Sequence, residues 1–232
     1  MAILLSASSI ADFIRCPRKV LYRITKPFPE IPSREMLIGR SAHYIIEKCW
    51  SDREKATKLV EDETIKNKYT KKESTNLSFY IDIFFLNFSG YLKSDDKIEF
   101  SFKVPLYDDV FVVGKIDRIS NATIFDWKTG RTSKNLQSDV QCMIYDFAYT
   151  TIYNKKPNGV CIASLAEGTL IPYREDELYV KEVFDNIIPR MIRTLRAKEY
   201  ERLGLFNHSC FRCQYKQGCL GDTHVVDSLE SS

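Results

Sequence analysis

The stretch GKIDRISNATIFDWKTG, residues 114–130, contains two apolar strands joined by a short polar turn. Side chains two apart on a strand share a face, so Asp126 and Lys128 project together, while the carbonyl of Trp127 can turn toward them. Asp117, on the preceding strand, can place a second carboxylate beside Asp126. Two carboxylates and a carbonyl are hard oxygen donors, which Mg²⁺ and Mn²⁺ prefer. A lysine beside such a metal can orient or deprotonate a water, so the stretch predicts phosphodiester hydrolysis.

The sequence around this stretch predicts a sheet followed by a helix. Apolar residues alternate from Lys97 onward and are interrupted by turn residues, which is typical of a strand meander. An apolar stripe at helical spacing predicts a helix over about 136–153, and the apolar run at 159–166 is β-like. Alternating strand and helix patterns of this kind indicate a mixed α/β fold.

Helices are predicted on both sides of this region. Upstream, Pro17 is expected to open a short helix, and Ser33 to begin a longer one that ends near residue 50. Residues 51–96 are rich in charged and polar side chains and are predicted to be a helical insert. Downstream, three-four spacing over 180–195 predicts a helix that Pro189 kinks or splits.

Four further residues are candidates for the same site. His43 shares a helix face with Gly39 and can offer an imidazole to a metal. Gln141 and Tyr145 are four apart on the helix after the strands and can orient Lys128, and Glu99 is an additional acid on the strand before Asp117. Each of these, like an isolated Asp-x-Lys pair, is common in proteins as an ordinary hydrogen bond, ion pair or exposed carboxylate. Only their combination indicates a site.

Composition excludes several classes of protein. The chain has 232 residues, of which 44% are apolar and 28% charged, an ordinary globular balance. No apolar run approaches about eighteen residues and the start lacks a signal-peptide pattern, so we expect an intracellular, cytoplasmic protein without membrane association. The net charge of +3 is too small to attract a polyanion by itself. A DNA-tracking groove is therefore predicted from a local set of basic residues, namely Arg18, Lys19, Lys115, Arg118, Arg131 and Lys134.

The seven cysteines suggest metal ligation, redox chemistry or plain burial, because disulfides are rare inside cells. Cys210, Cys213 and Cys219 follow one another at spacings that let a loop wrap one soft metal centre. Four thiolates would suit either Zn²⁺ or an iron–sulfur cluster, and the spacing does not decide between them. The candidates for the fourth ligand are Cys16, Cys49, His208 and His224.

Taken in order, four motifs resemble those of the RecB-type nucleases of the PD-(D/E)XK superfamily, over about 100 residues. They are GxxxH at Gly39–His43, GxxD at Gly114–Asp117, DxKTG at Asp126–Gly130 and QxxxY at Gln141–Tyr145. The resemblance implies that the metal ligands are His43, Asp117, Asp126 and the carbonyl of Trp127. It also implies that Lys128 is the catalytic lysine, with Gln141 and Tyr145 in the catalytic set. Ile116 stands where many superfamily members have proline, a substitution common in the RecB-type group.

The cysteines add a second resemblance, to the iron–sulfur subgroup of these nucleases. Cys16 in a Cys-Pro-Arg context, together with the C-terminal Cys-x2-Cys-x5-Cys, is similar to the pattern of that subgroup. This resemblance implies a structural 4Fe–4S cluster that fastens the two chain ends together, with the ligands Cys16, Cys210, Cys213 and Cys219. Because no Walker motif occurs, the chain is most similar to the free-standing CRISPR-associated RecB-like exonucleases and their viral relatives.

The resemblance implies a restriction-endonuclease-like fold, a mixed central sheet flanked by helices. We expect a single nuclease domain over 1–220, with a helical iron–sulfur subdomain built from 1–32 and 196–220. The helical insert at 51–96 lies within this domain, and a polar tail follows at 221–232.

The predicted activity is that of a DNA exonuclease that depends on Mg²⁺ or Mn²⁺ and acts on single-stranded or frayed ends. Its role would be in CRISPR adaptation or in DNA recombination and repair, with integrase or recombination proteins as partners. One alternative is a non-catalytic DNA-end binding subunit of an integration or repair complex. Another is an adaptor held together by zinc, in which the acids only form ion pairs.

Overall fold

The computed structural model describes residues 2–26, 32–130, 136–203, 208–211 and 213–221. Within the chain, contacts define two compact units. The first unit contains Met1–Ala7 and Ile31–Glu177, and the second contains Ser8–Glu30 and Leu178–Ser232. No helix in the described part of the chain is long and apolar enough to cross a membrane.

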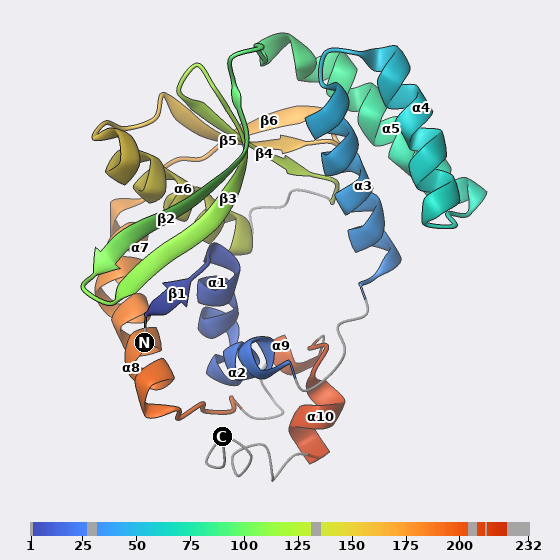
Figure 1. Ribbon diagram of the computed structural model, residues 1–232. Coiled ribbons are helices and arrows are strands. Elements are labelled where there is room, and N and C mark those ends of the chain that lie inside the picture. The colour runs from blue at the N-terminus through green and yellow to red at the C-terminus, as the bar shows by residue number, and fades with distance from the viewer. Residues whose placement is uncertain (1, 27–31, 131–135, 204–207, 212, 222–232) are drawn as a thin grey trace. The chain divides into compact units, whose positions relative to one another are not determined.

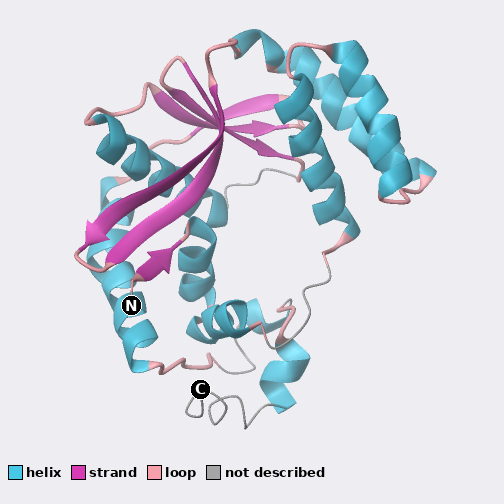
Figure 2. Ribbon diagram, in the orientation of Figure 1, coloured by secondary structure: helices cyan, strands magenta, loops and turns pink. Residues whose placement is uncertain are grey.

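A six-stranded mixed sheet forms the centre of the first unit. Its long strands β2 and β3 pair antiparallel over most of their length, and β3 also pairs with β1 in parallel and with β4 antiparallel (Figure 2). Strand β4 then pairs with β5 in parallel, and β5 with β6 antiparallel. The strands are β1 (Ile3–Leu5), β2 (Lys97–Tyr107), β3 (Val110–Ser120), β4 (Thr123–Lys128), β5 (Gly159–Ser164) and β6 (Thr169–Pro172).

Helices cover both faces of this sheet (Figure 1). Alternate side chains of β4 contact the helices on each face. Its Phe125 and Trp127 point into an apolar core that they share with α3, α4 and α5. The alternate side chains point to the opposite face, where Lys128 contacts Gln141 of α6. The helices are α3 (Arg34–Cys49), α4 (Arg53–Lys66), α5 (Lys71–Asn87), the short 3-10 turn η1 (Ser89–Tyr91) and α6 (Leu136–Tyr153).

Polar caps fix the starts of the helices around the insert. The side chain of Ser33 accepts a hydrogen bond from the backbone of the first turn of α3, as the sequence predicts. Asp52 caps α4 in the same way, and Thr70 with Glu73 forms a reciprocal capping box at the start of α5. Residues 51–96 thus contain α4, α5 and the turn η1.

The second unit is helical in its described part. Pro17 opens α2 as predicted, and Asp12 of α1 is buried in an ion pair with Lys19 of α2 at 2.6 Å. The predicted break near Pro189 is also confirmed, since a π-helical segment, η2, runs directly into the helix whose first turn holds this proline. The elements are α1 (Ala7–Arg15), α2 (Pro17–Thr25), α7 (Glu177–Lys181), η2 (Glu182–Ile187), α8 (Ile188–Ala197), α9 (His208–Phe211) and α10 (Lys216–Gly221).

Arg118 corrects one sequence prediction. It was expected in a DNA groove, but its side chain is 1% exposed and its Nε lies 2.8 Å from Asp96 Oδ2. The guanidinium also donates to the carbonyl of Lys93 and lies over the ring of Trp50, 4.4 Å from its centroid. Arg118 therefore fastens the end of the helical insert to β3 and is not available to a phosphate.

The buried pair predicts a large effect on stability. Asp96→Ala leaves the guanidinium of Arg118 buried without its counter-charge, and we expect it to lower the free energy of unfolding by about 3–5 kcal/mol. Urea denaturation measures this change. Asp95→Ala, at the exposed neighbouring position, should change stability by no more than about 0.5 kcal/mol. Equal effects of the two variants would contradict this description of the pair.

Candidate active site

The structure brings together all of the predicted catalytic and metal-binding residues of the first unit. His43 comes from α3, Asp117 from β3, Asp126, Trp127 and Lys128 from β4, and Gln141 and Tyr145 from α6. The strand-to-strand turn after β3 returns the chain so that β4 starts beside the end of β3. This turn places the two aspartates on adjacent strands at the same level of the sheet.

Two motif glycines allow the elements around the site to approach closely. A Cβ atom on Gly39 would lie 3.0 Å from the hydroxyl of Thr129, so this glycine lets α3 come close to the end of β4. On β3, a Cβ atom on Gly114 would lie 2.5 Å from the ring of Phe102. That ring packs edge-on against Tyr145, with centroids 6.1 Å apart. Gly114 thus makes room for the aromatic contact that supports α6 over the site.

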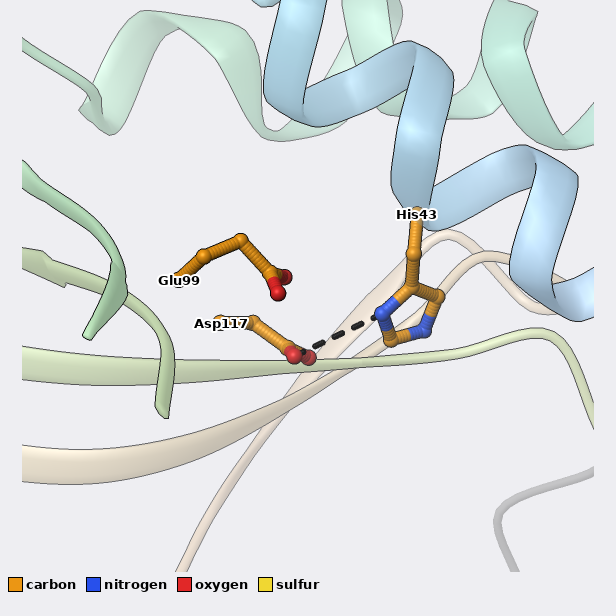
Figure 3. Close-up of side chains that lie close together, drawn as sticks. All are labelled: His43, Glu99 and Asp117. Carbon is orange, nitrogen blue, oxygen red and sulfur yellow. Dashed lines mark ion pairs between the residues drawn. The ribbon is translucent and has the colours of Figure 1, made fainter. Parts of the chain in front are cut away.

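The ring of His43 reaches from α3 toward Asp117 (Figure 3). Its Nε2 is 2.9 Å from the carbonyl oxygen of Trp127, and its Nδ1 is 3.4 Å from Asp117 Oδ1. The other oxygen of Asp117 accepts a hydrogen bond from the backbone N–H of Trp127 at 2.8 Å. Both ring nitrogens therefore face acceptors, an arrangement that suits the protonated imidazolium. Burial disfavours that charge, but the carboxylate of Asp117 outweighs burial and raises the pKa of His43.

Asp126 is the most deeply buried acid of the site, with 2% of its surface exposed. Burial raises the pKa of its carboxyl to about 6, and the charge of Lys128 offsets only part of that shift. Lys128 Nζ lies 2.7 Å from Asp126 Oδ2, but it directs its hydrogen bond at Gln141 Oε1, 2.8 Å away. The buried oxygen Oδ2 is therefore held by an ion pair with this ammonium.

A chain of hydrogen bonds from α6 holds Lys128. Gln141 accepts from Lys128 and donates to the hydroxyl of Tyr145, which in turn donates to the backbone carbonyl of Lys115 on β3. The ammonium therefore has one preferred position, fixed to the same strand that carries Asp117. Burial lowers the pKa of Lys128, yet the adjacent Asp126 outweighs burial and raises it, so the group is charged in this state.

These donors fit a divalent cation. His43, Glu99 and Asp117 each offer a ligand atom, and the three atoms lie within 4.8 Å of one another (Figure 3). The carboxylate of buried Asp126 and the carbonyl of Trp127, whose oxygen lies 2.9 Å from His43 Nε2, are further acceptors. Carboxylate, carbonyl and imidazole donors together suit Mg²⁺ or Mn²⁺. In the sequence Glu99 is only an additional candidate acid, and the structure places it in this three-atom group. Asp126 is not part of the group.

A pocket of about 310 Å³ opens beside these residues. Sequence reasoning did not single out Arg40 or Tyr44, although their positions next to Gly39 and His43 in α3 placed them on the same helical turns. The residues that line the pocket are Gly39, Arg40, His43, Tyr44, Glu47, Glu99 and Asp117.

Two further residues of the predicted groove form ion pairs. Lys19 is paired with Asp12, and Lys115 forms an ion pair with Glu99. Two members of the predicted groove lie outside the described residues: Arg131 and Lys134.

Four cysteines occur in the second unit, and all are partly exposed free thiols: Cys16, Cys210, Cys213 and Cys219. Burial is the main reason that the pKa of Cys210 is raised, and the charges of Cys16, Cys213 and Cys219 add to it. Cys16 stands at the N-cap position of α2 without a side-chain capping hydrogen bond. The centroid of the Tyr22 ring in α2 lies 5.2 Å from that of Tyr215, a residue between Cys213 and Cys219 in the sequence. Cys49 is buried in the apolar core of the first unit, and the side chains of His208 and His224 lie outside the described residues.

The fold and this site together define a restriction-endonuclease-like nuclease. The family model described as the PD-(D/E)XK nuclease superfamily matches residues 4–220, and the chain therefore belongs to that superfamily. No curated protein sequence matches the chain.

Solved structures support the fold. A crystal structure from Eubacterium rectale, provisionally described as an exonuclease, has a TM-score of 0.68 and 14% identity, and the match covers 99% of this chain and 93% of that one. At this identity the likeness establishes the restriction-endonuclease-like fold alone. A structure of the protein SSO0001 has a TM-score of 0.45 and 12% identity over 94% of this chain and 86% of that one, a likeness too low to support any argument.

The Gly114 contact predicts a steric effect on stability. Gly114→Ala forces the new methyl group into the ring of Phe102, and we expect a loss of about 1–3 kcal/mol of stability. Gly130→Ala, in the neighbouring motif, has no atom within 4 Å of the added Cβ and should be nearly neutral. Thermal unfolding of both variants measures the difference. A Gly114→Ala protein as stable as the wild type would show that the ring has room to move.

The protonation of the site predicts how cation binding depends on pH. His43 must lose its proton and Asp126, with a pKa of about 6, must be ionised before either can hold a cation. The apparent Mn²⁺ affinity should therefore rise with pH through about 6, by about tenfold per pH unit for each proton released. Calorimetric titrations between pH 5 and 8 test this. A pH-independent affinity would contradict the assignment of these two groups to the cation.

Proposed function

We propose that the protein is a divalent-metal-dependent DNA exonuclease that hydrolyses phosphodiester bonds at single-stranded or frayed ends. Lys128 carries this proposal. A purely structural lysine would be satisfied by its ion pair with Asp126, whereas this one is fixed by a chain of hydrogen bonds through Gln141 and Tyr145. Membership of a nuclease superfamily and the cluster of cation-binding donors support the same conclusion.

Each residue of the site would have a distinct part in the reaction. His43, Asp117, Asp126 and the carbonyl of Trp127 would hold the cation. When bound, Mg²⁺ or Mn²⁺ supplies positive charge for a phosphate oxygen and makes a water easier to deprotonate. Lys128, held as an ammonium, would orient the attacking water and screen the negative charge that develops on the phosphate. Gln141 and Tyr145 would keep Lys128 in that position.

The site also indicates the side from which the DNA would enter. Lys128 reaches it from the face covered by α6, whereas the pocket beside His43 opens along α3. The scissile phosphate would enter through that pocket, where Arg40 can pair with a neighbouring phosphate and the partly exposed ring of Tyr44 can contact a base.

We also propose that the second unit carries a structural 4Fe–4S cluster held by Cys16, Cys210, Cys213 and Cys219. The contribution of the Cys16, Cys213 and Cys219 charges to the raised pKa of Cys210, and the partly exposed setting that all four thiols share, support the ligand set. The cluster-bearing subdomain would consist of residues 1–32 and 196–220, apart from strand β1, which pairs with β3 in the first unit. A role in CRISPR adaptation or in DNA recombination and repair, with integrase or recombination proteins as partners, rests on the sequence resemblance.

Cleavage of end-labelled DNA tests the nuclease proposal. Wild type, purified without oxygen, should degrade single-stranded DNA with Mg²⁺ or Mn²⁺ and stop when a chelator is added. Lys128→Ala should be slower by about 100- to 10,000-fold while its DNA binding stays close to that of the wild type. Labels at either end show the polarity in the same gel. DNA binding without cleavage by wild type would favour the alternative of a DNA-end binding subunit.

Metal analysis tests the cluster. Protein purified without oxygen should contain about four iron atoms and four sulfides per chain. Cys213→Ser should lose them, whereas Cys161→Ser, which alters a thiol on β5 of the first unit, should retain them. Zinc without iron or sulfide would instead support the zinc-held alternative.

A further inference from the structure

Glu99 has a backbone conformation that its place in a strand does not explain. Its φ is +49°, in the left-handed region that side chains other than glycine rarely adopt. The described residues with positive φ otherwise lie in turns or at helix ends, and Glu99 alone lies inside a strand. A conformation of this kind persists only where its surroundings require it, commonly at functional sites.

The strained residue faces Asp117 across the β2–β3 ladder. The neighbouring pairs are Ile98 with Arg118 and Phe100 with Ile116, so Glu99 stands opposite Asp117 and the register is the same on both sides. The carboxylate of Glu99 consequently lies beside Asp117 and His43, close enough for all three to contact one ion (Figure 3).

Lys115 neutralises Glu99 in this state. The two side chains form a short ion pair, in which Lys115 is 55% exposed and Glu99 25% exposed. Lys115 and Asp117 are two apart on β3 and share a face, so the ammonium also faces the charge of Asp117. An exposed lysine of this kind can swing into solvent without disturbing the strand, because its backbone carbonyl is held separately by Tyr145.

We propose that Glu99 is a further carboxylate ligand of the catalytic cation, and that Lys115 is a tethered ammonium that occupies Glu99 until the cation displaces it. The inference rests on the proposed metal-dependent function. It explains the strained backbone at Glu99, because the positive φ places this carboxylate as a ligand. Glu99 lies outside the four sequence motifs. Lys115 then competes with the cation for Glu99. When the cation displaces Lys115, the ammonium becomes a mobile positive charge at the edge of the pocket where a DNA phosphate would enter.

Two substitutions with opposite expected effects test this proposal by calorimetric Mn²⁺ titration of the full chain. Glu99→Gln should weaken Mn²⁺ binding by about 10- to 100-fold, because it removes a charged ligand. Lys115→Met should tighten it by roughly three- to tenfold, because it removes the competing ammonium. Glu175→Gln, which breaks the ion pair with Lys156 outside the site, should leave the affinity unchanged.

A second pair of variants separates the ligand from the strain. Glu99→Ala and Glu99→Gly both lack the carboxylate and should lose Mn²⁺ affinity equally. Glu99→Gly should melt at a higher temperature than Glu99→Ala, because glycine adopts a positive φ without strain.

Several outcomes would overturn the inference. If Glu99→Gln binds Mn²⁺ as tightly as wild type, or if both Glu99→Gln and Lys115→Met weaken binding, the pair is only a structural brace and the proposed nuclease function is untouched. If wild type itself binds no Mn²⁺ at millimolar concentration, both the inference and the proposed function fail.

Discussion

Negative charge gathered at one level of the sheet is the constraint that the first unit is built to satisfy. Asp117 and Asp126 come from adjacent strands, and Glu99 joins them from a third. Carboxylates this close repel one another unless positive charge is present. Without a cation, three groups supply it: Lys128, His43 and Lys115. A divalent ion brings two positive charges, so it can take the place of the His43 proton and the Lys115 ammonium while Lys128 stays.

The fold serves this constraint from both faces of the sheet. Alternation along β4 sends Trp127 into the core with α3–α5 and leaves its carbonyl for His43, while Lys128 on the other face meets α6. Close packing at two glycines brings these helices within reach. Asp117 and Lys128 are close in the sequence, but it is helices far apart in the sequence that hold this part of the sheet in position from its two faces.

Much of this arrangement could be predicted from the sequence, because motif spacing and periodicity are local properties. The strands around the site, the capped helix carrying His43 and the α6 pair Gln141 and Tyr145 all followed from them. Strands β1 and β6, of three and four residues, are too short for a periodic signal and form through partners elsewhere in the chain. The burial of Arg118 depends on an insert more than twenty residues away, and the positive φ of Glu99 has no signature in residue type.

The most direct test is a crystal structure of the full chain grown with Mn²⁺, with anomalous diffraction collected at the manganese absorption edge. The account predicts one anomalous peak about 2.0–2.3 Å from ligand atoms of His43, Asp117, Asp126 and the carbonyl of Trp127. The imidazole should then have left its contact with that carbonyl. A peak bound only by surface carboxylates elsewhere, or none at millimolar Mn²⁺, would contradict the claim that these residues form a catalytic metal centre.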